Sequence, residues 1–221
     1  MKKIGIPGWV SQGVFGVGIS YIEYFRNFGE VYILQPDQTI KLDLLVLPGG
    51  ADLSPATYDS IVSMHIGQSN PMLDYFDTNS LPFYIQEGIP IFGICRGAQR
   101  LWTLNGGTLL PHYPNHKQSS YKEDLAHPLY YRGKKLNLDV TSRHHQVMLN
   151  EDIGFQILED KDDDIVEGFF SDTVSGVQYH PEDNGDTDWF TPIIIKKMLN
   201  GEKISIEHII KNNKISGYQY R

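Results

Sequence analysis

The chain has 221 residues, with 19 Lys and Arg against 27 Asp and Glu and a formal net charge of -8. This length suits one α/β domain with a sizeable core, so we expect residues 1–221 to form a single domain. The acidic balance excludes a nucleic-acid binder, because no basic stripe is available to neutralise phosphates. The single cysteine permits no internal disulfide, and no apolar run approaches the ~20 residues needed to cross a bilayer. We therefore expect a cytoplasmic protein that binds neither nucleic acids nor membranes.

The first half of the chain alternates apolar strand patterns with helical patterns. Apolar residues recur at helical spacing from Val14 to Phe28, and Gly29 ends that predicted helix. Residues 72–86 are predicted to be partly helical, with Pro82 either kinking the segment or lying in the first turn of a shorter helix. The predicted strands are Ile4–Pro7, Val31–Leu34, the nearly all-apolar Leu42–Leu47, and Ile89–Phe92. This alternation favours a parallel sheet with helices on both faces.

The second half carries shorter, partly antiparallel strand patterns and two closing helices. The acidic run Glu159–Asp164 is interpreted as a solvated loop, since it lacks the glycine and the spacing of a calcium-binding loop. The predicted strands are 107–110, 136–140, 155–158, 165–169 and 174–179, and the predicted helices are 189–199 and 205–211. The expected fold is therefore α/β: an open, mostly parallel sheet with helices on both faces and a smaller antiparallel strand extension.

The only cysteine, Cys95, lies in the pentapeptide Gly93-Ile94-Cys95-Arg96-Gly97, directly after an apolar strand. This is the cysteine version of a nucleophile elbow, in which flanking glycines remove the Cβ atoms that would clash in a tight strand-to-helix turn. The helix that follows would point free N–H groups at the sulfur and favour a thiolate. A buried structural cysteine is the alternative, and the two glycines argue against it.

A cysteine nucleophile needs a base and a group that orients the base. The tripeptide His180-Pro181-Glu182 follows a predicted strand, so both polar side chains can lie at the end of that strand. Sites in open parallel sheets form beyond the carboxyl ends of the strands, which brings Cys95 and His180 to one edge. Glu182 can then accept a hydrogen bond from the imidazole and set its tautomer.

Acyl transfer also needs an oxyanion hole, and two backbone segments can supply it. The N–H of Arg96, just past the nucleophile, is one donor. Pro48-Gly49-Gly50 ends a buried strand, and Gly49 and Gly50 permit the close backbone approach that a second donor requires. An ordinary tight turn is the alternative interpretation of this tripeptide.

These motifs resemble the class I glutamine amidotransferase superfamily in order and spacing, over nearly the whole chain. Two further stretches are similar to its gamma-glutamyl hydrolase branch, whose members cleave γ-glutamyl amides such as γ-glutamyl-aminobutyrate without a synthetase domain. The superfamily motifs are Leu47–Gly50, Phe92–Gln99 and Gly176–Glu182, and the branch motifs are Gly50–Tyr58 and Ser142–Gln146. One departure is the branch's Asp-x-x-Glu stretch, which we align with Asp77–Ser80, where serine replaces the final acid.

The resemblance implies a flavodoxin-like fold and assigns roles to individual residues. The implied triad is Cys95, His180 and Glu182, and the implied oxyanion hole is Gly49 or Gly50 with Arg96. Gln99 would help to bind the glutamine moiety, while His144, His145 and Gln146 would border the substrate pocket. For these last three residues a surface turn is the alternative. We expect no cofactor and no metal, because the paired histidines lack cysteine or carboxylate partners at ligand spacing.

Three functions are compatible with the sequence. In the first, the chain hydrolyses a γ-glutamyl amide bond in glutamine or a γ-glutamyl amine through a γ-glutamyl thioester on Cys95. In the second, it is a glutaminase subunit that supplies ammonia to a separate ATP-dependent synthetase, since the chain itself has no phosphate-binding P-loop motif. In the third, it is a non-catalytic binding module on the same fold. The intact Cys, His and Glu set argues against the third.

Overall fold

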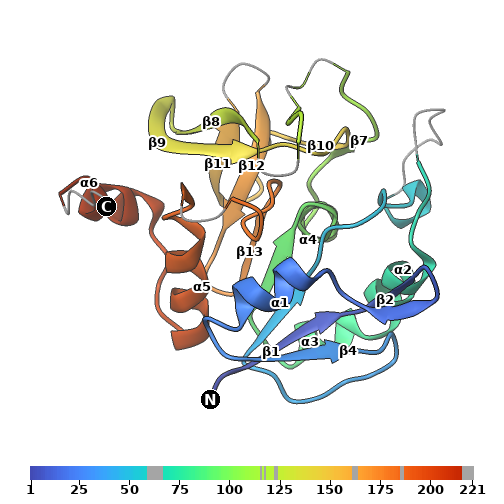
Figure 1. Cartoon of the computed structure of the whole chain (residues 1–221). Helices are drawn as coiled ribbons and strands as arrows, with labels where there is room; N and C mark the ends of the chain where they lie inside the picture. The colour runs from blue at the N-terminus through green and yellow to red at the C-terminus, as the bar shows by residue number, and fades with distance from the viewer. Residues whose placement is uncertain are drawn as a thin grey trace.

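The computed structural model describes residues 1–58, 67–114, 116, 118–121, 124–160, 164–184 and 187–215. Within these residues, one 11-stranded sheet runs through the molecule, and a separate two-stranded hairpin lies beside it (Figure 1). The hairpin is formed by β2 (Trp9–Ser11) and β3 (Val14–Gly16).

The candidate nucleophile and base, Cys95 and His180, follow strands in the parallel half of the sheet. Its order is β4 (Glu30–Leu34), β1 (Lys3–Pro7), β5 (Leu44–Leu47), β6 (Ile91–Ile94) and β13 (Val174–Val177). Every residue of β5 and β6 is buried, as expected for central strands covered on both faces. Numbered along the chain, these parallel strands have the order 2-1-3-4-5, which defines the flavodoxin-like class. The predicted fold class is confirmed.

The sheet continues beyond β13 with antiparallel strands. In spatial order these are β12 (Ile165–Phe170), β11 (Gln156–Asp160), β8 (Leu125–Tyr131) and β9 (Lys134–Thr141), with β10 (Val147–Leu149) pairing β12 and β7 (Leu109–Leu110) pairing β10. Neither β8 nor β10 was predicted. In β8 the register with β9 shifts on either side of His127 and Pro128, because proline cannot donate to a regular ladder. These irregularities explain why the sequence pattern did not predict β8.

Helices cover both faces of the sheet and separate two apolar cores. One core contains side chains of α1 (Ile19–Phe25), α5 (Thr191–Asn200) and α6 (Ile206–Ile215). The other contains side chains of α2 (Pro71–Asn79), α3 (Leu81–Gln86) and α4 (Arg96–Leu104). Because α1 and α4 contribute to different cores, they cover opposite faces of the sheet. Pro82 lies in the first turn of α3, one of the two placements predicted for it.

Two predictions about local structure are wrong. The helix predicted from Val14 begins only at Ile19, because Gln12 and Gly13 have φ of 50° and 80° and form the tight turn of a β-hairpin. The spacing of Val14 and Val17 is typical of an apolar helical face, but the tight turn at Gln12 and Gly13 places this segment in a β-hairpin instead. In the acidic run, Asp160 ends β11 with only 4% of its surface exposed, so this residue is not part of a solvated loop. Residues 161–163 of that run lie outside the described residues.

Candidate active site

Cys95 lies at the junction of β6 and α4 in a conformation that few residues adopt. Its φ is 49° and its ψ is -108°, and its N–H donates to the Val177 carbonyl at 2.8 Å. The flanking glycines are sterically required. A Cβ on Gly97 would come within 2.2 Å of the Leu47 carbonyl oxygen, and one on Gly93 within 2.6 Å of the Ala98 nitrogen. The sequence pattern is therefore a true strand-to-helix elbow, with strain stored at the cysteine.

His180 reaches the same edge from the neighbouring strand. Val177 of β13 pairs with Ile94 of β6 in parallel register, which brings the two strand ends together. The His180 Nδ1 lies 2.7 Å from Glu182 Oε1, so the carboxylate holds the proton on Nδ1 and directs Nε2 away from itself. The Glu182 side chain is 2% exposed.

Electrostatics link the histidine to the sulfur. Burial by itself lowers the pKa of His180, but the charge and hydrogen bond of Cys95, together with those of Glu182, outweigh it and raise the pKa to about 10. A proton on His180 beside Cys95 is therefore favoured at neutral pH. This is the state in which a histidine can protonate a departing amine.

Tyr21 of α1 joins the triad to the end of β5, a role that the sequence did not reveal. Its hydroxyl accepts a hydrogen bond from the Gly49 N–H at 2.9 Å and also pairs with Glu182. Burial, and then the charges of Glu182 and Cys95, raise the pKa of Tyr21 well above its ordinary value. The phenol therefore stays protonated beside the carboxylate. In the sequence, Tyr21 is simply one apolar position on a helical face, indistinguishable from a core residue.

Gly49, just beyond the end of β5, lies against His180 and Cys95. A Cβ on Gly49 would approach the Cε1 of His180 and the hydroxyl of Tyr21 to 2.8 Å each, and the Cβ of Cys95 to 3.4 Å. Only glycine leaves room for the imidazole at this point.

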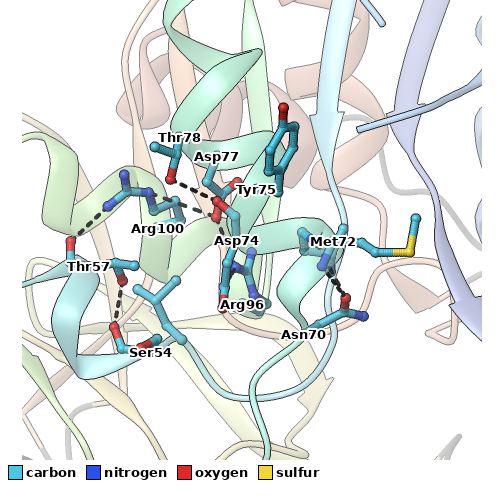
Figure 2. Close-up of polar contacts among 12 residues, drawn as sticks. Ser54, Thr57, Asn70, Met72, Asp74, Tyr75, Asp77, Thr78, Arg96 and Arg100 are labelled. Carbon is cyan, nitrogen blue, oxygen red and sulfur yellow. Dashed lines mark hydrogen bonds and ion pairs between the residues drawn. The ribbon is translucent and has the colours of Figure 1, made fainter. Parts of the chain in front are cut away.

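The Arg96 side chain lies in a buried ion-pair cluster, shown in Figure 2. One terminal nitrogen contacts Asp74 Oδ1 at 2.5 Å and Asp77 Oδ2 at 2.9 Å, and Arg100 lies 3.8 Å from the same Asp77 oxygen. Both acids come from α2, whose N-terminus is capped by the Asn70 side chain. The cluster therefore anchors the first turn of α4, and with it the Arg96 N–H, to α2.

The stretch Asp77–Ser80, aligned above with Asp-x-x-Glu, begins in this cluster and ends outside it. Ser80 forms the junction between α2 and α3, where its hydroxyl donates to the Pro36 carbonyl at 2.8 Å. Asp74 and Asp77, one turn earlier, place two acids on one face of α2.

The residues predicted to bind substrate do gather in one region, but most of them bind each other. Gln99 donates from Nε2 to the Gln146 carbonyl at 3.1 Å and to Gln178 Oε1 at 3.3 Å. Gln146 exchanges hydrogen bonds with both backbone groups of Leu53. Because Gln99, His144 and Gln146 are at most 5% exposed, the surface-turn interpretation is wrong for His144 and Gln146.

A cavity of about 220 Å³ opens beside this segment. His145 contributes to its wall and has a more accessible side chain, 37% exposed, whose Nε2 lies 3.0 Å from Asp52. Arg143, also in the wall, pairs with Asp183, the residue after Glu182. The cavity wall is thus tied to the triad loop. The full lining is His112, Tyr113, Pro114, His116, Gln118, Arg143, His144 and His145.

The strand order and the elbow place the chain in the flavodoxin-like fold class, and comparison with known proteins agrees with this fold. A family model described as Peptidase C26 matches residues 34–182, so the chain belongs to the Peptidase C26 family, with relatives among glutamine amidotransferase-like proteins. The glutamine amidotransferase-like protein YvdE of Lactococcus lactis is 29% identical over 205 residues, spanning 82% of this chain and 87% of its own.

Two solved structures share the fold. A protein from Thermoplasma acidophilum, described as one of the subunits of GMP synthase, superposes with a TM-score of 0.61 at 20% identity, covering 98% of each chain. A glutamine amidotransferase from Thermotoga maritima gives 0.56 at 14% identity, covering 90% of this chain and 94% of its own. Membership in this family indicates an enzyme. Among the described residues, no helix has the length and apolar character needed to cross a membrane.

Proposed function

We propose that this protein is a cysteine-dependent hydrolase of γ-glutamyl amide bonds that acts through a γ-glutamyl thioester on Cys95. The observation that carries the proposal is the buried arrangement of three groups: a strained elbow cysteine, a histidine charged next to it, and a carboxylate 2.7 Å from that histidine. A non-catalytic binding module has no need for a strained cysteine and a charged histidine held together in this way.

The reaction follows from these positions. The Cys95 sulfur attacks the γ-carbonyl carbon, and His180 passes its proton to the departing amine. Water, deprotonated by the now neutral His180, then attacks the thioester and releases glutamate. Glu182 holds the imidazole in the productive tautomer throughout, and the Tyr21 phenol lies beside Glu182.

We assign the oxyanion hole to the N–H groups of Gly50 and Arg96. Gly49 is the weaker candidate because its N–H already donates to the Tyr21 hydroxyl. Gly49 instead contributes the space that the imidazole occupies. The buried Arg96 side chain fixes the second donor through its ion pairs with α2.

Substrate recognition is proposed for the cavity wall. Arg143 and His145 are two of its partly exposed polar side chains, and they suit the α-carboxylate of a glutamyl group. Of the residues predicted to border the substrate pocket, His144 lines this cavity, while the buried Gln99 and Gln146 position the 142–146 segment.

A glutaminase subunit is the second candidate, and the structural neighbour from GMP synthase favours it. In that case the same chemistry would release ammonia from glutamine to a synthetase partner. The branch motifs at 50–58 and 142–146 favour the free-standing hydrolase.

The test is glutamate release from glutamine, γ-glutamyl-aminobutyrate and γ-glutamyl anilide, with Cys95→Ala and His180→Ala beside His208→Ala. His208 is an exposed histidine on α6 and serves as the matched control. The hydrolase requires turnover of a γ-glutamyl amine well above that of glutamine, abolished in the first two variants and intact in the control. Turnover of glutamine alone, stimulated by a synthetase, would favour the second candidate. Full activity of Cys95→Ala would refute both.

A further inference from the structure

Three buried glutamines lie around the triad, and each comes from a different segment of the chain. They are Gln99 of α4, Gln146 of the 142–146 segment and Gln178, which directly follows β13. Each is at most 2% exposed, and the reaction proposed above uses none of them as an acid, base or nucleophile. A primary amide is costly to bury unless it is hydrogen-bonded, so the contacts of these three side chains show what they stabilise.

Gln99 joins the other two glutamines. Its Nε2 carries two N–H groups, and it donates to Gln178 Oε1 at 3.3 Å and to the Gln146 carbonyl oxygen at 3.1 Å. The backbone N–H of Gln99 donates to the Cys95 carbonyl at 3.0 Å, so this residue lies one helical turn beyond the nucleophile. Gln178 lies two residues before His180. The first hydrogen bond therefore links the helix that follows the cysteine to the strand end that carries the histidine.

The backbone of α4 already packs closely against two strands of the sheet. A Cβ on Gly176 of β13 would come within 3.0 Å of the Ala98 Cβ, and one on Gly97 would come within 2.2 Å of the Leu47 carbonyl oxygen of β5. These contacts set how near the helix lies to the sheet. Hydrogen bonds depend on angle as well as distance, so the two bonds from Gln99 add a directional constraint to a helix that packing holds in place.

A second chain of contacts between the cysteine and the histidine begins at the end of β9. There, Thr141 Oγ1 accepts a hydrogen bond from the His180 N–H at 3.3 Å, and the Thr141 N–H donates to Asn184 Oδ1 at 3.2 Å. Further along the same segment, the Gln146 carbonyl accepts the hydrogen bond from Gln99. Both routes from α4 to His180 therefore meet at the Gln99 amide.

The same contacts reach the proposed oxyanion donor. The Gln146 side chain accepts a hydrogen bond from the Leu53 N–H at 3.0 Å and donates one to the Leu53 carbonyl at 3.3 Å. Leu53 lies three residues beyond Gly50, whose N–H is assigned above to the oxyanion hole. Through Gln146, the Gln99 amide is thus connected to this side of the site as well.

We propose that Gln99 is a positioning residue that sets the distance and angle between Cys95 and His180 by holding Gln178 and Gln146. This role rests on the hydrolase chemistry proposed above, and it requires no contact between Gln99 and the substrate. Both N–H groups of the Gln99 amide are engaged by the protein itself. Direct binding of the glutamine moiety by Gln99, which the family resemblance implies, is the competing interpretation.

The first test is the kinetics of Gln99→Met, which keeps the approximate size of the side chain and removes both donors. Because a displacement of about 1 Å can cost about 100-fold in rate, we expect kcat for glutamate release to fall about 10–100-fold, with KM within about 3-fold of the parent. A raised KM with unchanged kcat would show that Gln99 binds substrate, and parent kinetics would show that its hydrogen bonds are dispensable. Either result would overturn the proposal.

Ser80→Ala is the matched control for the loss of a buried hydrogen bond. Ser80 is as buried as Gln99, and its hydroxyl donates to the Pro36 carbonyl at the junction of α2 and α3, which carries no triad residue. This variant should melt at a lower temperature than the parent and keep kcat within about 3-fold. If Gln99→Met does not fold, Gln178→Met replaces it and should lower kcat about 10-fold. An equal loss of kcat in the control would reduce the effect to stability and overturn the proposal.

The second test does not depend on hydrolysis. Burial lowers the pKa of His180, but the charge and hydrogen bond of Cys95, together with those of Glu182, raise it to about 10. In Gln99→Met, NMR titration should therefore show the pKa of His180 moved from the parent value towards that of Cys95→Ala. An unchanged pKa would overturn the positioning role. If the parent releases no glutamate from any γ-glutamyl compound, the proposed function fails, and this titration still tests whether Gln99 aligns the two residues.

Discussion

The ion-pair cluster beneath the nucleophile elbow makes a quantitative prediction about stability. Arg96 and Asp77 are 2% and 3% exposed, and burial raises the pKa of Asp77 in spite of the two guanidinium groups beside it. The desolvation cost of this pair is therefore large. Pairs of this kind contribute little net stability, yet removing one partner costs about 3–5 kcal/mol because the other charge remains buried.

Asp77→Ala should lie at the lower end of that range. Asp74 stays 2.5 Å from Arg96 and continues to neutralise it, so we expect a loss of about 3 kcal/mol in the free energy of unfolding. For a chain of this size, that corresponds to a melting temperature lowered by about 6–12 °C. Differential scanning calorimetry and urea unfolding measure the two quantities.

Two control variants sharpen the test. Asp74→Ala removes a carboxylate that is 20% exposed, so it should cost about 1.5 kcal/mol, less than Asp77→Ala. The double variant Arg96→Met/Asp77→Leu removes both buried charges and should recover most of the lost stability. An Asp77→Ala protein that melts within about 2 °C of the parent, or a double variant less stable than the single one, would refute this reasoning.

Three further predictions concern the triad. Glu182→Gln should lower kcat by at least about 100-fold with little change in KM, because the histidine loses its charged partner; unchanged steady-state kcat would contradict this. In Cys95→Ala, the charge and hydrogen bond that raise the pKa of His180 are gone and burial remains, so NMR titration should show a pKa well below the value of about 10 in the parent. Because that pKa lies above the unfolded value of 6.5, its stabilisation is complete below pH 6.5 and is lost as the pH rises towards 10. Urea unfolding should show a shallower decline over this window in Cys95→Ala, and equal slopes would contradict the assignment. Gly49→Ala places a methyl group 2.8 Å from His180 and from the Tyr21 hydroxyl, so activity should fall about 100-fold in a folded protein; normal kinetics would show that the imidazole does not need this space.

The sequence predicted the parallel half of the fold well because its signals are local. Leu44–Leu47 is a continuous apolar run, and Gly93 and Gly97 bracket Cys95 at the spacing that the elbow requires. The triad followed from the rule that parallel strands end at one edge. It needed only the identity of the residues after β6 and β13.

The failures share a physical cause: they depend on contacts between segments distant in the sequence. His116 and His127 lie 3.4 Å and 3.9 Å from Glu167 Oε1, a proximity that their spacing along the chain does not predict. From the sequence, Tyr21 looks like a core residue, because its contacts with Gly49 and Glu182 arise only when α1 packs in the fold. The role of Asp74 and Asp77 becomes clear only from their ion pairs with the buried guanidinium of Arg96.

The most direct test of the proposed mechanism is to trap its covalent intermediate. The protein is mixed with γ-glutamyl anilide, quenched in acid within the first turnover, digested and analysed by mass spectrometry. The account predicts a γ-glutamyl adduct on the peptide that contains Cys95, which decays as glutamate appears and is absent from Cys95→Ala. Glutamate release without any adduct on Cys95, at a rate that Cys95→Ala retains, would contradict the central claim.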